Sequence, residues 1–112
     1  ETLCAADVFL LSSASEGMPN SLIEAIDAGC SIVSSDVGGV KEINGDNGNL
    51  INIIHGRDSS VFAEALLNIS NAPFPCQNNS DMRSQRLDFF SSENIMPLFY
   101  NLFENALLEK AR

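Results

Sequence analysis

Basic residues are scarce in this chain of 112 residues, which has six Lys and Arg against 15 Asp and Glu and a formal net charge of −9 at pH 7. Binding to nucleic acid or to anionic lipid needs Lys and Arg to neutralise phosphates. The charge balance therefore argues against nucleic acid as a partner of this segment. Long apolar runs are also lacking, since none approaches the roughly 20 residues of a membrane span.

Cysteine and histidine are too few, and too widely spaced, for a disulfide framework or a zinc site. The cysteines are Cys4, Cys30 and Cys76, an odd number, and His55 is the single histidine. No Cys, His or Asp cluster surrounds His55, so we expect no metal ion. Cys4 and Cys30 sit among small apolar residues, which predicts buried free thiols in a reducing cytosol.

The start of the chain lacks an initiator Met, a basic region and a signal-peptide cleavage pattern. We therefore expect a segment of a longer protein, located in the cytoplasm or at the inner face of the membrane. The length allows one domain, and 45% apolar residues suit a globular core.

Apolar patterning predicts alternating strands and helices. Pro19 is placed at the first position of a helix and Gly29 at its end, while Asp58 or Ser59 caps a later helix. The expected strands are 7–12, 31–35 and 50–54, and the expected helices are 21–28, 60–70, 81–90 and 92 onward, with a helical turn at 41–43. This order is typical of an α/β layer with a parallel sheet.

The last expected helix has apolar residues at spacings of three and four, which favours a face that packs in the core. The alternative for a segment of a longer protein is that part of this face is exposed where a missing domain packed. These residues are Ile95, Met96, Phe99, Leu102, Phe103, Ala106 and Leu107.

Two loops, 12–19 and 36–40, follow expected strands. Ligands of parallel sheets bind beyond the carboxyl ends of the strands, so both loops are expected to open on one edge and to share a site.

The chemistry of the first loop centres on the start of the helix that follows it. Asn20 and Ser21 present backbone N–H groups without helical partners, which together with the helix dipole favour a phosphate. Gly17 allows a ligand to approach the backbone. Glu16 and Glu24 carry carboxylates that accept hydrogen bonds from sugar or ribose hydroxyls. The pattern indicates a site for a nucleoside diphosphate sugar.

Simpler interpretations exist for both carboxylates. Glu16 could serve the helix dipole alone, and Glu24 could be a solvated helix residue.

The sequence Ala6-Asp7-Val8-Phe9-Leu10-Leu11, followed by the segment from Ser15 to Ala25, resembles the donor-site signature of retaining glycosyltransferases of the GT-B fold, family 4 (glycosyl transferases group 1). That signature has two glutamates separated by seven residues. The resemblance spans nearly the whole chain and is specific in its first half. It continues in Ala28-Gly29, Ile32 to Gly39, Glu42-Ile43, Gly48 to Ile51, Arg86, Phe90-Ser91 and Tyr100 to Leu102.

The resemblance implies a Rossmann-like parallel sheet with flanking helices, the C-terminal half of a GT-B fold. Residues 1–112 would form one nucleotide-sugar-binding domain, incomplete on its N-terminal side, with 81–112 as closing helices. The family usually has Pro where Ser31 stands, and Ser merely relaxes the entry to the strand.

The resemblance also implies a role for each residue of the first loop. Glu16 would be the catalytic residue and contact hydroxyls of the transferred sugar. Glu24 would hold the ribose. The sugar pocket would be lined by Gly17, Met18 and Pro19, the diphosphate would meet Asn20 and Ser21, and the loop at Gly38 and Gly39 would border the pocket.

For the full-length parent, the resemblance implies a glycosyltransferase of the hexosyltransferase type. It would use a nucleotide sugar such as a UDP-sugar, without metal or cofactor, and an acceptor sugar, lipid or glycan. The basic groups for the diphosphate and an N-terminal acceptor domain would lie upstream of Glu1, so we expect the segment alone to be inactive.

Three alternatives stay open. The first is a non-catalytic module that binds a nucleotide sugar. The second is a dinucleotide-binding oxidoreductase domain, although Gly38-Gly39 lacks the third glycine of Gly-x-Gly-x-x-Gly. The third is a structural interaction domain.

Overall fold

The computed structural model describes residues 2–46, 50–72 and 80–111. Each predicted strand and helix is confirmed within two residues at its described ends, and a short 3-10 helix near the N-terminus was not predicted. The elements are η1 (Leu3–Ala5), β1 (Val8–Leu11), α1 (Asn20–Ala28), β2 (Ser31–Ser35), α2 (Val40–Asn44), β3 (Ile51–Ile54), α3 (Ser59–Asn71), α5 (Ser80–Phe89) and α6 (Ser92–Lys110).

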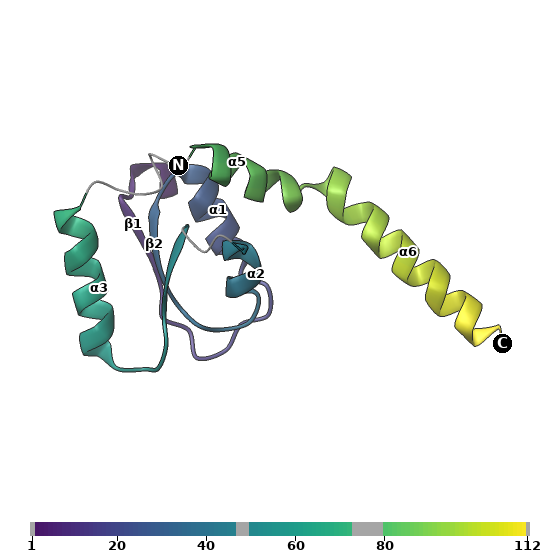
Figure 1. The fold of residues 1–112 in the computed structure, drawn as a ribbon, viewed down its shortest axis with the longest axis horizontal. Helices are drawn as coiled ribbons and strands as arrows, with labels where there is room; N and C mark the ends of the chain where they lie inside the picture. The colour runs from purple at the N-terminus through teal and green to yellow at the C-terminus, as the bar shows by residue number, and fades with distance from the viewer. Residues whose placement is uncertain (1, 47–49, 73–79, 112) are drawn as a thin grey trace.

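The three strands form a parallel sheet in the order β1-β2-β3, with Val8 opposite Ser31 and Ile32 opposite Ile51. Helix α3 covers one face, and α1 and α2 cover the other (Figure 1). This arrangement confirms the predicted α/β, Rossmann-like parallel sheet with flanking helices. The loops that follow the strands gather at one end of the sheet, the lower end in Figure 1, as predicted for 12–19 and 36–40.

Strand β2 is buried along its whole length because it lies between two strands and under helices on both faces. The larger core lies on the α1 side of the sheet, and the smaller one lies under α3. The larger core has the buried residues Leu22, Ala25, Ile26, Cys30, Ile32, Val40, Ile43, Leu50 and Ile51, and the smaller one has Val33, Ile54 and Ala65.

Helix ends follow the expected chemistry, with one shift. Asp58 is the cap of α3, and its Oδ1 accepts from the Ser60 N–H at 3.0 Å, which lowers the pKa of this carboxyl. Gly29 ends α1 in the left-handed region at φ 82°. Pro19 stands one position earlier than predicted. It is the extended N-cap residue, with ψ 96°, rather than the first helical residue.

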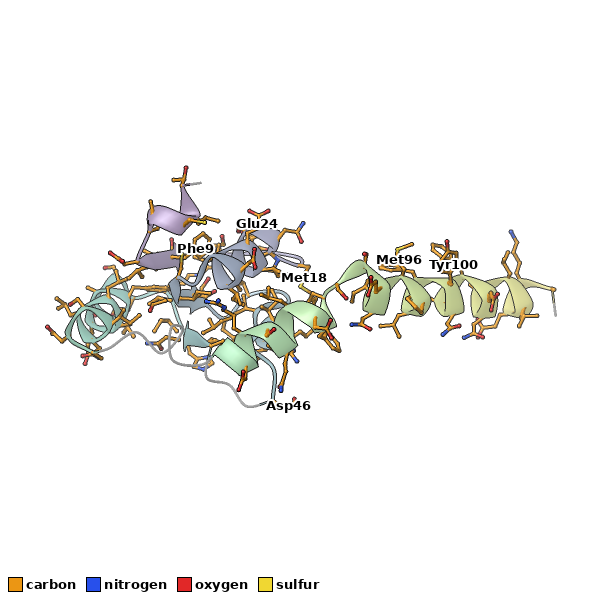
Figure 2. The ribbon with its side chains drawn as sticks, turned by 90° about the horizontal axis from the view of Figure 1, so that it is seen from above. Phe9, Met18, Glu24, Asp46, Met96 and Tyr100 are labelled. Carbon is orange, nitrogen blue, oxygen red and sulfur yellow. The ribbon has the colours of Figure 1, made fainter. Side chains whose placement is uncertain are left out.

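Helix α6 extends away from the sheet, so that the molecule is 58 Å long but only about half as wide (Figure 1). Figure 2 shows Met96 and Tyr100 along this extension. The prediction that its apolar face packs in the core is wrong, since Phe99, Phe103 and Leu107 are 50%, 63% and 68% exposed. Helical spacing defines a face but not its partner. Within the described ranges, no helix is long and apolar enough to span a membrane.

Of the two cysteines in the described ranges, one is buried and the other is exposed. Cys30 is buried, and its Sγ donates to the carbonyl oxygens of Leu3 and Ala6 at 3.3 and 3.5 Å, while burial raises its pKa. Cys4 was predicted to be buried but is exposed, because it lies on η1 at the surface. Cys76 lies outside the described residues.

Candidate functional site

The loops after β1 and β2 meet at the carboxyl edge of the sheet. The Gly39 N–H donates to the Gly17 carbonyl oxygen at 2.7 Å. Gly38 has φ +48°, and a Cβ added there would overlap the carbonyl oxygens of Gly17 and Glu16. A Cβ at Gly39 would lie 2.7 Å from the Met18 sulfur. The glycine pair therefore does more than turn the chain, because it lets the second loop support the first.

The first turn of α1 presents free donors at this edge. The Leu22 N–H donates to the Pro19 carbonyl at 3.0 Å, which closes the helix tightly behind its cap residue. Within the described part of the chain, no side chain caps α1. The backbone N–H groups of Asn20 and Ser21 precede the first bonded turn, and such groups attract anions. The phosphate role of Asn20 and Ser21 stays a prediction.

Both candidate carboxylates are exposed at the surface of this region. The Ser13 hydroxyl donates to Glu16 Oε1 at 2.7 Å and so orients this side chain. Glu24 lies on α1 one turn after Asn20, and residues four apart share a helix face. Figure 2 places Glu24 on α1 with Met18 nearby, in the segment that precedes the helix. Glu16 thus precedes the start of α1, and Glu24 lies one turn after that start.

Gly17 differs from the other glycines of the site. Its φ is not in the left-handed region, and a Cβ built on it would meet nothing within 4 Å. Neither the backbone nor the packing of this chain therefore requires glycine at this position. A side chain there would instead occupy open space.

Sequence reasoning missed the residues that hold the base of the first loop. The Ser35 hydroxyl lies 2.7 Å from the carbonyl oxygen of Ser13 and 3.3 Å from that of Leu11. Ser35 therefore links the end of β2 to the end of β1 and to the beginning of the loop that contains Glu16. Serine runs are common in loops, so they do not indicate such a role. The sequence signal for Ser35 was its position at the end of a predicted strand, at the carboxyl edge of the sheet.

A charged cluster at the same edge was also missed. Asp36 follows β2, and its Oδ2 lies 2.9 Å from the Lys41 Nζ and 3.1 Å from the His55 Nδ1. The hydrogen bond from Lys41 is the main cause that holds the pKa of Asp36 below its ordinary value. His55 thus contacts a carboxylate, and the residues 2–46, 50–72 and 80–111 contain no group of three potential ligands that could hold a metal ion.

A cavity of about 440 Å³ lies beside the first loop, between the loop's beginning and α3. Its lining is mainly apolar and also includes serine hydroxyl groups and one arginine. Its lining residues are Leu10, Ser12, Ser13, Ala14, Ser35, Gly56, Arg57, Ser59, Phe62, Ala63 and Leu66. None of the candidate residues from Glu16 to Glu24 lines it, so we locate the candidate site at the open helix start and not in this cavity.

Comparison with known proteins assigns the family. A family model described as "Glycosyl transferases group 1" matches residues 1–72, well over half of the chain. The chain belongs to the group 1 glycosyltransferases. The matched segment contains the whole sheet, both loops of the carboxyl edge, and α1 to α3.

One curated relative is a Bacillus subtilis (strain 168) protein, TuaC, whose name describes a glycosyltransferase of teichuronic acid biosynthesis. It is 41% identical over 64 residues, which cover 57% of this chain and 16% of that protein. The chain therefore corresponds to a small part of the relative's length. This group 1 glycosyltransferase segment includes the predicted donor loop, and the role of each loop residue remains a prediction.

Proposed function

We propose that this chain is the donor-binding part of a retaining glycosyltransferase with the GT-B fold, of family 4. The parent enzyme would move a hexose from a nucleoside diphosphate sugar, such as a UDP-sugar, to a hydroxyl group of an acceptor sugar, lipid or glycan. The membership of the chain in the group 1 glycosyltransferases supports the reaction class. The loop after β1 supports the assignment of the donor side.

One observation carries the proposal. The open start of α1 lies between two exposed carboxylates, and Gly17, three residues before the helix, has open space where a side chain would stand. The diphosphate binds the N–H groups of Asn20 and Ser21, where the positive end of the helix dipole lies. Glu24, one turn along the helix, accepts hydrogen bonds from the ribose hydroxyls. Glu16, on the other side, accepts hydrogen bonds from the transferred sugar.

The same arrangement accounts for how transfer proceeds without a metal ion. As the bond to the sugar breaks, negative charge grows on the leaving diphosphate. Donors that are already oriented stabilise this charge without further rearrangement. The helix start supplies part of this stabilisation, and basic side chains from the upstream part of the parent supply the rest. We therefore expect this segment alone to bind donor but not to turn it over.

The ribose role of Glu24 has a direct test. UDP titrated into the chain should shift the amide resonances of Asn20 and Ser21, and Glu24→Gln should weaken UDP binding by about 1–3 kcal/mol, the value of a hydrogen bond to a charged group. Glu64→Gln is the matched control, since Glu64 is an exposed glutamate on α3. Equal UDP affinity in wild type and Glu24→Gln would refute the ribose role.

Glu16→Gln should separate sugar recognition from nucleotide recognition. In the parent enzyme it should reduce turnover strongly while the affinity for UDP stays unchanged. An equal loss of affinity for UDP and for UDP-glucose would contradict the sugar assignment. If the wild-type parent binds the donor but transfers no sugar to any acceptor, the protein is a nucleotide-sugar binding module instead.

A further inference from the structure

Helix α5 presents two arginines toward the C-terminal ends of α1 and α2. Arg83 and Arg86 are three positions apart, so they lie on the same side of α5. Helix α5 lies beside α1 in Figure 1. This helix follows residue 72, where the match to the family model ends.

Arg86 closes the C-terminal end of α2. Its Nε donates to the carbonyl oxygen of Ile43 at 3.1 Å, and its Nη2 donates to the carbonyl oxygen of Glu42. The carbonyls of a last helical turn lack partners within the helix, and a cation there also complements the dipole. The guanidinium carbon lies 5.0 Å from the ring centre of Phe89, so an aromatic side chain of α5 supports it.

Two left-handed glycines make room for these arginines. Gly45, with φ +73°, ends α2, and a Cβ there would lie 2.8 Å from the Arg86 Cζ. Gly29, with φ +82°, ends α1, and a Cβ there would lie 2.9 Å from an Arg83 guanidinium nitrogen. Each arginine therefore lies close to a glycine that ends a helix with a positive φ.

A continuous path of hydrogen bonds joins Arg86 to the candidate donor loop. Arg86 donates to the Ile43 carbonyl, the Ile43 N–H donates to the Gly39 carbonyl at 2.9 Å, and the Gly39 N–H donates to the Gly17 carbonyl at 2.7 Å. Helix α2 spans the path in little more than one turn. A change at Arg86 therefore reaches Gly17 through one short rigid element.

We infer that Arg83 and Arg86 are positioning residues of the donor site, because they lie against the C-terminal ends of the two helices whose N-terminal ends form it. Arg83 lies beside the end of α1, whose start would bind the diphosphate. Arg86 acts on α2, which holds the loop at Gly17. The effect on the loop stands on the contacts alone, and the effect on donor binding rests on the proposed function.

Amide hydrogen exchange tests the effect on the loop. Arg86→Gln should speed exchange of the Gly39 amide about tenfold, since a charged hydrogen bond is lost and α2 opens locally more often. The Val33 amide, in the central strand, should change by less than about twofold if only local opening is affected. Equal acceleration at Gly39 and Val33, or none at Gly39, would overturn the inference.

Two further variants keep this test interpretable. Arg86→Lys retains the charge without the planar fork, so its Gly39 exchange should fall between the wild type and Arg86→Gln. If Arg86→Gln does not fold, faster hydrogen exchange of the Gly39 amide in Arg86→Lys supports the inference in its place. An unchanged exchange rate in Arg86→Lys counts against the inference. Arg57→Gln is the matched control, because Arg57 is exposed on the loop after β3 and should leave Gly39 unaffected.

Pyrophosphate binding tests the effect on the donor site separately. Pyrophosphate titrated into the chain should shift the Asn20 and Ser21 amides, and both Arg83→Gln and Arg86→Gln should weaken its binding about threefold to tenfold. If wild type gives no shifts, the proposed phosphate site fails while the exchange result still decides the positioning role. If pyrophosphate binds equally to all variants, the arginines do not position the donor site.

Discussion

The two ends of this chain use apolar residues in opposite ways. In residues 2–72, a core of apolar side chains is buried between the sheet and its helices, and Leu22, Val33 and Ile43 are completely inaccessible to solvent. In α6, the apolar residues follow the same helical spacing but remain exposed, as Phe103 and Leu107 show. Both regions contain helices with apolar residues at helical spacing. Only the first region also contains a sheet on which its helices pack.

This difference shows that helical periodicity predicts which side chains share a face but not whether that face is buried. Periodicity determines which side chains share a face, because it follows from the geometry of the helix. Burial requires a second surface, and α6 contacts mainly α5. The stability of the molecule should therefore depend on α1, the sheet and α2 far more than on α6.

The largest expected effect tests this contrast with one type of substitution at two places. Leu22→Ala should lower the free energy of unfolding by about 2–5 kcal/mol, because it leaves a cavity in a packed core. Leu107→Ala, at a side chain 68% exposed on α6, should change it by less than about 0.5 kcal/mol. Urea denaturation measures both. Similar losses in the two variants would mean that α6 packs on a surface in solution, and the contrast would disappear.

A second pair of variants compares two glycines within residues 2–72. One lies at the candidate site and the other lies outside it. Gly38 and Gly56 both have positive φ, so alanine at either position incurs backbone strain of about 1–2 kcal/mol. Alanine at Gly38 would also overlap the carbonyl oxygen of Gly17, whereas a Cβ at Gly56 meets nothing within 4 Å.

The total loss for Gly38→Ala should therefore exceed about 3 kcal/mol, within the range of severe single substitutions. Thermal unfolding of the two variants provides the measurement. A loss in Gly56→Ala as large as that in Gly38→Ala would show that the two loops do not press together at Gly17.

The smallest effect concerns charge at the carboxyl edge of the sheet. Lys41 holds the pKa of Asp36 below its ordinary value of 3.8. A carboxyl with a lowered folded-state pKa contributes stability above its ordinary pKa, and this contribution is lost as pH falls through the folded-state value. Lys41→Met should raise the pKa of Asp36 toward 3.8, as followed by NMR titration of the carboxyl carbon.

Lys110→Met, at the far end of α6, serves as the charge-matched control for this titration. Its Asp36 midpoint should equal that of the wild type. An unchanged Asp36 midpoint in Lys41→Met would mean that the contact between Lys41 and Asp36 does not persist in solution.

The sequence was sufficient to predict the elements because their signals are local. Alternating apolar runs, Pro19, Gly29 and Asp58 act within a few residues of themselves, and each prediction required a shift of at most two positions. The edge of the candidate site was also predictable, since consecutive parallel strands place their following loops together. The geometry around Gly17, Asn20 and Ser21 agrees with that expectation.

The contacts between distant residues were not predictable in this way. Asn44 is buried, and its Oδ1 accepts from the N–H groups of Leu50 and Ile51 at 3.1 and 3.0 Å, a role that its neighbours in the sequence do not indicate. Ser35, Arg83 and Arg86 act across 22 or more residues of sequence. Cys4 and the apolar face of α6 were misassigned for a related reason, because neighbouring residues along the chain do not show where the surface lies.

The bond between Gly39 and Gly17 has a thermodynamic consequence for the C-terminal helices. Coupling free energy between two sites is reciprocal. If the docking of α5 on the ends of α1 and α2 strengthens donor binding, then a bound donor must strengthen the docking of α5 by the same factor. Under that condition, the chain with bound donor would hold α5, and α6 that continues from it, more firmly than the empty chain.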